Sequence, residues 1–195
     1  MNKQKLAIIL TILFGILQSI DCQSDITKRK TVNITIETTK GDIDVELYET
    51  DAPKTVANFI GLAEEGYFNG IIFHRISKGF VIQGGDSTGT GMGGKSIYGK
   101  EFADELNPST PSYQEGYKRG VVAMANRGPN TNTSQFFIVL KDASRMPKLY
   151  TIFGKVTKGM DVVDSIAAVE IIPQMSDTDG KPKVDVVMKK VLVKK

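Results

Sequence analysis

The chain has 195 residues, of which 41% are hydrophobic and 24% are charged, as expected for one well-packed globular domain. Its net charge of +3 is small and evenly spread, which argues against nucleic acid or an anionic membrane as a partner. Cys22 is the only cysteine and His74 the only histidine, so disulfides, cysteine nucleophiles and multi-histidine zinc sites are excluded from the domain.

The first 23 residues have the order of a secretory signal peptide. Lys3 and Lys5 precede an apolar run over 6–17, which is short for a membrane span and gives way to polar residues. We predict a signal peptide over 1–23, a polar linker over 24–30 and one folded domain over 31–195. An uncleaved anchor is the alternative, because no clean pair of small residues marks a cleavage site. The C-terminal Val-Leu-Val-Lys-Lys lacks a KDEL-type signal, so secretion is expected over retention in the endoplasmic reticulum.

The folded domain opens with a predicted β-hairpin and a helix. Apolar and polar residues alternate over 32–36 and again over 43–47, with a Thr-Lys-Gly turn between the two segments. A helix should follow, with Asp51 as its N-cap, Pro53 in its first turn and Gly66 at its end. Its apolar residues recur with helical spacing, so one stripe should pack inward.

The remainder of the chain is predicted to be mostly strands. A short helix is expected after Gly159, and alternation over 184–193 predicts a closing strand. Antiparallel strands with two helices are typical of a mainly β fold in which a closed or nearly closed barrel has helices over its ends. The other predicted strands are short apolar runs between glycine-rich loops, at 71–73, 80–82, 121–124 and 136–140.

The most informative segments are Phe-His-Arg-Ile at 73–76 and Gly-Phe-Val-Ile-Gln-Gly-Gly-Asp at 79–86. Spacing alone favours an ordinary arginine on a barrel rim and a glutamine in a turn. Together with Val-Ala-Met-Ala-Asn at 122–126 and Gly-Pro-Asn-Thr-Asn-Thr-Ser-Gln-Phe-Phe-Ile at 128–138, however, these segments resemble the cyclophilins. The resemblance runs in order over roughly residues 31–193.

This resemblance implies a closed eight-stranded antiparallel β-barrel capped by two α-helices. It also implies a peptidyl-prolyl cis-trans isomerase, which rotates X–Pro bonds in proline-containing peptides and in unfolded or folding client proteins of the secretory pathway. The rotation barrier is about 18–20 kcal/mol, and no bond is made or broken, so the resemblance implies no metal and no cofactor. A monomer is expected. The alternative is a non-catalytic proline-peptide binding module or chaperone that uses the same groove.

The family's site residues carry over to positions that match its motifs. Arg75 matches the arginine that hydrogen-bonds the prolyl nitrogen as the bond twists. The remaining catalytic positions are Phe80 and Phe137, which line the proline pocket with Val81, and Gln83 and Asn126, which hydrogen-bond the substrate backbone. Further substrate-binding positions are Ala125, Gln135, Met146 and Tyr150, the last two standing where the family commonly has Leu and His.

One position departs from the family pattern. The chain has no tryptophan, and Arg145 occupies the place of the frequent groove tryptophan. In the resembling proteins that indole donates a hydrogen bond to the inhibitor cyclosporin. We therefore expect weak cyclosporin binding with isomerase activity retained.

Two further motifs resemble ligand sites but lack part of what such sites need. Residues 89–96 satisfy the P-loop pattern G-x-x-x-x-G-K-S, yet Ile-Tyr-Gly follows where a helix should begin. Residues 177–188 begin like a calcium loop but end in Met188, where a glutamate ligand is required. We expect a glycine-rich loop and a hairpin turn, and keep a nucleotide-binding protein as a rival hypothesis.

Two N-glycosylation sequons occur, at Asn33-Ile34-Thr35 and Asn132-Thr133-Ser134. Asn33 lies on a predicted strand and is a candidate for modification in a eukaryotic host. Asn132 lies in a loop of the candidate groove, where a glycan would obstruct a bound peptide. We therefore expect Asn132 to be unmodified.

Overall fold

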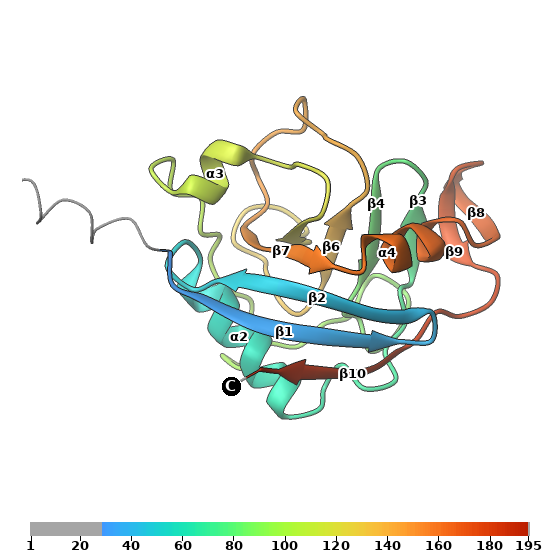
Figure 1. Ribbon diagram of the computed structural model, residues 1–195, viewed down its shortest axis with the longest axis horizontal. Coiled ribbons are helices and arrows are strands. Elements are labelled where there is room, and N and C mark those ends of the chain that lie inside the picture. The colour runs from blue at the N-terminus through green and yellow to red at the C-terminus, as the bar shows by residue number, and fades with distance from the viewer. Residues whose placement is uncertain (1–28, 195) are drawn as a thin grey trace, which may run out of the picture.

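The computed structural model describes residues 29–194, so the predicted signal peptide and most of the linker lie outside the described residues. Within this part the chain forms one antiparallel sheet in the order β10-β1-β2-β7-β5-β6-β4-β3-β9-β8, together with three helices (Figure 1). No helix in residues 29–194 is long and apolar enough to cross a membrane. The strands are β1 (Thr31–Thr38), β2 (Gly41–Tyr48), β3 (Arg75–Ser77), β4 (Val81–Gly84), β5 (Val121–Met124), β6 (Phe136–Val139), β7 (Ile152–Lys158), β8 (Ile171–Ser176), β9 (Asp179–Pro182) and β10 (Met188–Val193); the helices are α2 (Pro53–Glu64), α3 (Pro111–Glu115) and α4 (Met160–Ala167).

The closed eight-stranded barrel with two helices that the sequence predicted is not confirmed. Among the described residues the sheet has ten strands, and no strand ladder joins its two ends, β10 and β8. The sheet still curls back on itself, because the segment before β3 bonds to the segment before β10, with Phe73 N–H donating to Val186 O over 2.9 Å. The third helix, α3, was not predicted because its five residues are too few to show helical periodicity.

The β1–β2 hairpin and α2 form where the sequence predicted them. The two strands pair along their whole lengths, from Thr31 opposite Tyr48 to Thr38 opposite Gly41. Gly66 follows the end of α2 with a φ of +70°, the left-handed conformation that glycine adopts at low cost. The predicted stop signal is therefore confirmed.

The start of α2 differs from the prediction in its capping residue. The N-cap is Ala52 rather than Asp51, and it makes no side-chain cap bond. The carboxylate of Glu105, far along the chain, accepts the backbone N–H groups of Lys54 and Thr55 at 3.1 and 2.9 Å. Asp51 instead accepts a hydrogen bond from the start of α3. Sequence spacing favoured the nearest carboxylate, whereas the fold brings a distant one to the free N–H groups.

The strands β4, β5 and β6 are buried on both faces, which explains their continuous apolar runs. Successive side chains of β6 alternate between two hydrophobic clusters: Phe136 and Ile138 join the larger one, whereas Phe137 and Val139 join a smaller one. The helices α2 and α4 contribute to the larger cluster. The smaller cluster contains Tyr117 and other residues from the loops that cover the opposite face.

Aromatic rings fill the larger cluster beneath α2. The ring of Phe59 stacks on Phe68 with centroids 4.7 Å apart, and it meets Phe136 edge-on at 5.4 Å. Such pairs add stability beyond the apolar area that they bury. The helix is thereby fixed against the inner face of β6, and the outer face of the same strand is left to form a site.

Candidate active site

Strand register places three predicted site residues in one row across the sheet. Arg75 of β3 lies opposite Gln83 of β4, and Gln83 lies opposite Phe137 of β6. Directly opposed residues of antiparallel strands share a face, and this is the face that carries the smaller cluster. A slip of one residue in either ladder would turn a member of the row to the other face.

This row forms part of a groove with a volume of about 370 Å³. Every site residue predicted from the sequence lines the groove except Gln135. A volume of this size is within the range of pockets for small ligands. The lining residues are Arg75, Phe80, Val81, Gln83, Ala125, Asn126, Phe137, Met146, Pro147 and Tyr150.

The guanidinium of Arg75 is held on two sides. Its Nε and Nη2 donate to the two carboxylate oxygens of Asp179 at 2.9 and 2.7 Å, and its Nη1 donates to Gln83 Oε1 at 3.1 Å. A bidentate pair of this kind fixes the plane of the guanidinium as well as its position. The hydrogen bond from Arg75 also lowers the pKa of Asp179, so the carboxylate stays ionised. Three of the five N–H donors are used, which leaves two for a ligand.

Asp179 reaches Arg75 because β9 lies directly beside β3. Ser77 pairs with Asp179, and Ile76 pairs with Gly180. A side chain at position 180 would collide with β8, since a Cβ there would lie 2.0 Å from Ile172 O. Gly180 therefore permits the close approach of β8 that holds Asp179 at the edge of the groove.

Gln135 lies behind the groove and orients Gln83. Gln83 Nε2 donates to Gln135 Oε1 at 3.0 Å, which leaves Gln83 Oε1 directed at Arg75. Gln135 Nε2 in turn donates to the carbonyl oxygens of Gly91 and Gly93 at 2.9 and 2.7 Å. In the structure Gln135 makes a supporting contact, in which the loop over 86–95 fixes the rotamers of both glutamines, and its contact with substrate stays a prediction.

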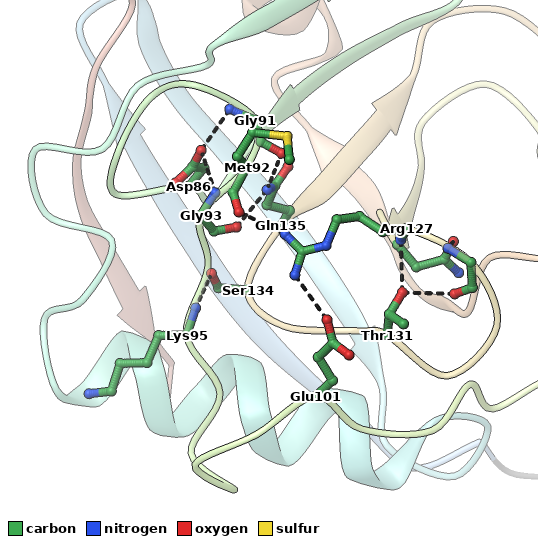
Figure 2. A network of polar contacts seen from close by, with 12 residues as sticks. Asp86, Gly91, Met92, Gly93, Lys95, Glu101, Arg127, Thr131, Ser134 and Gln135 are labelled. Carbon is green, nitrogen blue, oxygen red and sulfur yellow. Dashed lines mark hydrogen bonds and ion pairs between the residues drawn. The ribbon is translucent and has the colours of Figure 1, made fainter.

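Polar contacts on two sides hold the loop over 86–95 in place (Figure 2). The carboxylate of Asp86 accepts backbone N–H groups from residues within 88–93, the shortest at 2.7 Å. Burial alone would raise the pKa of Asp86, but these hydrogen bonds lower it to about 2. From the other side, Arg127 donates to Met92 O at 2.7 Å and to the Glu101 carboxylate at 2.9 Å. The glycine-rich loop therefore has a defined conformation.

The apolar wall of the groove is built from aromatic contacts. The rings of Phe137 and Tyr150 meet edge-on with centroids 5.6 Å apart. The hydroxyl of Tyr117 donates to the carbonyl of Tyr150 and accepts its backbone N–H, both at 3.0 Å. Burial raises the pKa of Tyr117 to about 12, so this hydroxyl keeps its proton at neutral pH. Tyr117 thereby positions Tyr150, whose ring lines the groove.

Asn126 lines the groove, but its side-chain N–H groups point elsewhere. Asn126 Nδ2 donates to Leu149 O at 3.0 Å and to the Asp104 carboxylate at 3.3 Å. These bonds connect the end of β5 to the loops on either side of it. The side-chain donors of Asn126 therefore support the groove wall, and the substrate contact that the resemblance implies stays a prediction.

His74 lies next to Arg75 in sequence but is buried on the other side of the strand, only 5% exposed. Neither ring nitrogen has a hydrogen-bond partner within residues 29–194. Burial lowers the pKa of His74, outweighing the opposite effect of the Asp86 carboxylate. The imidazole is therefore neutral at pH 7 and adds no second positive charge beside the guanidinium.

The segment that matches the P-loop pattern forms a loop, and the segment that begins like a calcium loop begins with a turn, as predicted from the sequence. No helix begins at Lys95; its backbone N–H donates to Ser134 Oγ and its ammonium pairs with Glu65. Residues 89–96 therefore lack the helix N-terminus that binds phosphate in a P-loop. Residues 177–178 form the turn between β8 and β9.

Sequence reasoning missed three residues of the site. Asp179 is 104 positions from Arg75, and only the pairing of β3 with β9 brings the two together. Tyr117 has no local signal, since its partner Tyr150 lies 33 positions away. Pro147 follows the predicted Met146 directly and lines the same wall.

Comparisons with known proteins agree on one family. The family model described as cyclophilin type peptidyl-prolyl cis-trans isomerase matches residues 32–193. A Neurospora crassa protein named peptidyl-prolyl cis-trans isomerase-like 1 is 46% identical over 164 residues, which cover 83% of this chain and 93% of that protein. The human protein of the same name is 49% identical over 147 residues, which cover 75% of this chain and 86% of the human one.

Solved structures agree with the sequence comparisons. A crystal structure of a cyclophilin type peptidyl-prolyl cis-trans isomerase from Cryptosporidium parvum superposes with a TM-score of 0.76 at 36% sequence identity, covering 85% of this chain and 99% of the other. A second crystal structure of that protein, obtained in the presence of the dipeptide Ala-Pro, superposes with a TM-score of 0.75 at 37% identity, over 84% of this chain and 99% of the other.

Proposed function

Because the chain belongs to the cyclophilin-type peptidyl-prolyl cis-trans isomerases, we propose that it isomerises X–Pro bonds in this groove with Arg75 as the catalytic donor. The observation that carries the assignment of Arg75 is the fixed guanidinium, which lines the groove and is held by Asp179 and Gln83, with two of its five N–H donors not engaged by residues 29–194. An isomerase of this family binds proline-containing peptides. The roles of the individual groove residues in binding and rotation are part of the proposal.

The reaction requires stabilisation of a twisted amide. In the planar ground state the prolyl nitrogen shares its lone pair with the carbonyl, which gives a barrier of about 18–20 kcal/mol. Rotation breaks this conjugation and leaves the lone pair on nitrogen. A guanidinium N–H that donates to this nitrogen binds the twisted state more strongly than the planar one, and the barrier falls. No bond is broken, so the step needs neither a nucleophile nor a cofactor.

The apolar wall would hold the proline ring during rotation. Phe80, Val81 and Phe137 line the groove together with Tyr150, whose ring meets that of Phe137. Fixing the ring lets the preceding residue turn while the prolyl nitrogen stays near Arg75. The Cryptosporidium parvum structure obtained in the presence of Ala-Pro supports an X–Pro dipeptide as a ligand of this groove.

Replacing Arg75 tests the catalytic assignment. We expect Arg75→Ala to lower kcat/KM for a short X–Pro peptide by about 10²–10³-fold, because one preorganised donor is removed from the transition state. The rate is measured by magnetisation exchange between the cis and trans peptide signals. Arg119→Ala serves as the control, since Arg119 forms a comparable pair with Asp164 at 2.7 Å outside the groove. Equal rates for wild type and Arg75→Ala would support the non-catalytic binding module instead.

Asp179 is expected to act through Arg75. Asp179→Ala removes the bidentate acceptor, so kcat should fall by about tenfold with a smaller change in KM, because the guanidinium loses its orientation. Asp179→Asn keeps one oxygen acceptor and should lose less. Asp164→Ala breaks the matching Arg119 pair and should leave both constants near wild type. An unchanged kcat in a folded Asp179→Ala protein would remove Asp179 from the mechanism.

Cyclosporin should bind this protein weakly. Arg145 is exposed beside the groove, where the resembling proteins place an indole N–H donor for the inhibitor. We expect Arg145→Trp to tighten cyclosporin binding. In the peptide assay the wild-type protein should need far more cyclosporin than Arg145→Trp for the same inhibition. Nanomolar inhibition of the wild-type protein would contradict this expectation.

We also propose that the protein enters the secretory pathway and is released by cleavage before the linker over 24–30. The order of charged, apolar and polar residues over 1–23 supports this proposal. In the secretory pathway Asn132 is expected to stay unglycosylated. Its side chain is fully buried, and its Nδ2 donates to Phe102 O and to the Asp104 carboxylate, which supports this expectation. N-terminal sequencing of the native protein should find a start within 19–24, and an intact Met1 would refute cleavage.

A further inference from the structure

A second, more open hollow of about 590 Å³ adjoins the catalytic groove. The two share Phe80, Met146 and Pro147 in their walls, so a peptide lying in the groove can extend into the hollow. The connection from β6 to β7, at the top of Figure 1, carries most of the hollow's lining. The other lining residues are Asp142, Ala143, Ser144 and Arg145.

Among residues 29–194, Arg145 is the one cation of this hollow without a protein partner. Arg145 is exposed, and within residues 29–194 its guanidinium forms no hydrogen bond or ion pair with a side chain. Asp142, the only carboxylate in the lining, is already engaged: it accepts the backbone N–H of Arg119 at 2.9 Å and pairs with Lys118 at 3.3 Å. The hydrogen bond from Arg119 lowers the pKa of Asp142, so this carboxylate stays ionised and committed to those partners.

The surroundings of Arg145 are also positive. The segment over 141–148 carries Lys141, Arg145 and Lys148 against the single carboxylate of Asp142. The Lys148 ammonium donates to a neutral acceptor, the carbonyl of Tyr113, so its charge is not neutralised there. The segment that carries Arg145 therefore has a net positive charge, and its complement is a negatively charged side chain.

We propose that this hollow is a subsite for an acidic side chain of the substrate, with Arg145 as the residue that binds the carboxylate. The proposal rests on the proposed isomerase function and adds a substrate class to it, namely X–Pro sequences with Asp or Glu close to the proline. The planar guanidinium can receive a carboxylate through two parallel hydrogen bonds. Phe80, Met146 and Pro147 supply apolar surface for the methylene groups of the same side chain.

The size of the effect follows from exposure. A solvent-exposed ion pair contributes little, so an acidic residue should improve kcat/KM by about two- to fivefold, and salt should screen the gain. The gain should act on binding and on the association rate more than on rotation, because Arg145 is outside the row that contains Arg75. KM should therefore fall while kcat stays near its value for the neutral peptide.

The test compares matched peptides with the full chain. Each short peptide contains one central Ala-Pro bond. Three positions precede that dipeptide and three follow it, and a pair of peptides is made for each position, one with Glu and one with Gln there. At low salt the wild-type protein should prefer Glu over Gln by about two- to fivefold at one or more of these positions. The preference should vanish in Arg145→Gln and at high salt. In Arg145→Glu a Lys-containing peptide should become the better substrate.

The controls separate this proposal from the isomerase function itself. Lys189→Gln removes an exposed cation of β10 and should keep the preference for Glu. If the neutral Gln peptides are not accelerated at all, the isomerase function fails. If they are accelerated but no position favours Glu, or if the preference persists in Arg145→Gln, the acidic subsite is refuted and the function stands.

Discussion

The site depends on the fixed position of one guanidinium. Arg75 is clamped by the Asp179 carboxylate on one side and by the Gln83 amide on the other. Each clamp comes from a neighbouring strand, β9 or β4, so the orientation of the arginine is set by the register of two ladders. A free arginine would lose side-chain entropy when it met the twisted amide, whereas this one has lost it on folding.

Support for this clamp extends well beyond the groove. Gln83 is turned the right way because Gln135 accepts its N–H, and Gln135 is fixed by the carbonyls of the loop over 86–95. That loop is held in turn by Asp86 and Arg127. An isomerase that makes and breaks no bond can lower its barrier only by placing donors and apolar walls before the substrate arrives. The glycine-rich loop and its anchors are thus part of the catalytic device.

The sequence predicted local features well and long-range contacts poorly. The alternation over 32–47 and the apolar runs of β4, β5 and β6 identified the strands, because periodicity reflects which faces are buried. The cap of α2 was assigned to Asp51, but Glu105 occupies that role from across the fold. Asp179 was hidden for the same reason, since its partner lies 104 positions away. The resemblance named the groove residues, but it could not show that Gln135 supports the groove from behind.

The most direct test of a preorganised Arg75 is the behaviour of its Nε–H group in the free protein, observed by ¹⁵N NMR and assigned by its loss in Arg75→Lys. The clamp predicts a single sharp resonance that exchanges slowly with water, with an order parameter close to that of the β3 backbone, before any peptide is added. Addition of a proline peptide should leave that order unchanged. A mobile, rapidly exchanging Nε–H that becomes ordered only when peptide binds would contradict the account.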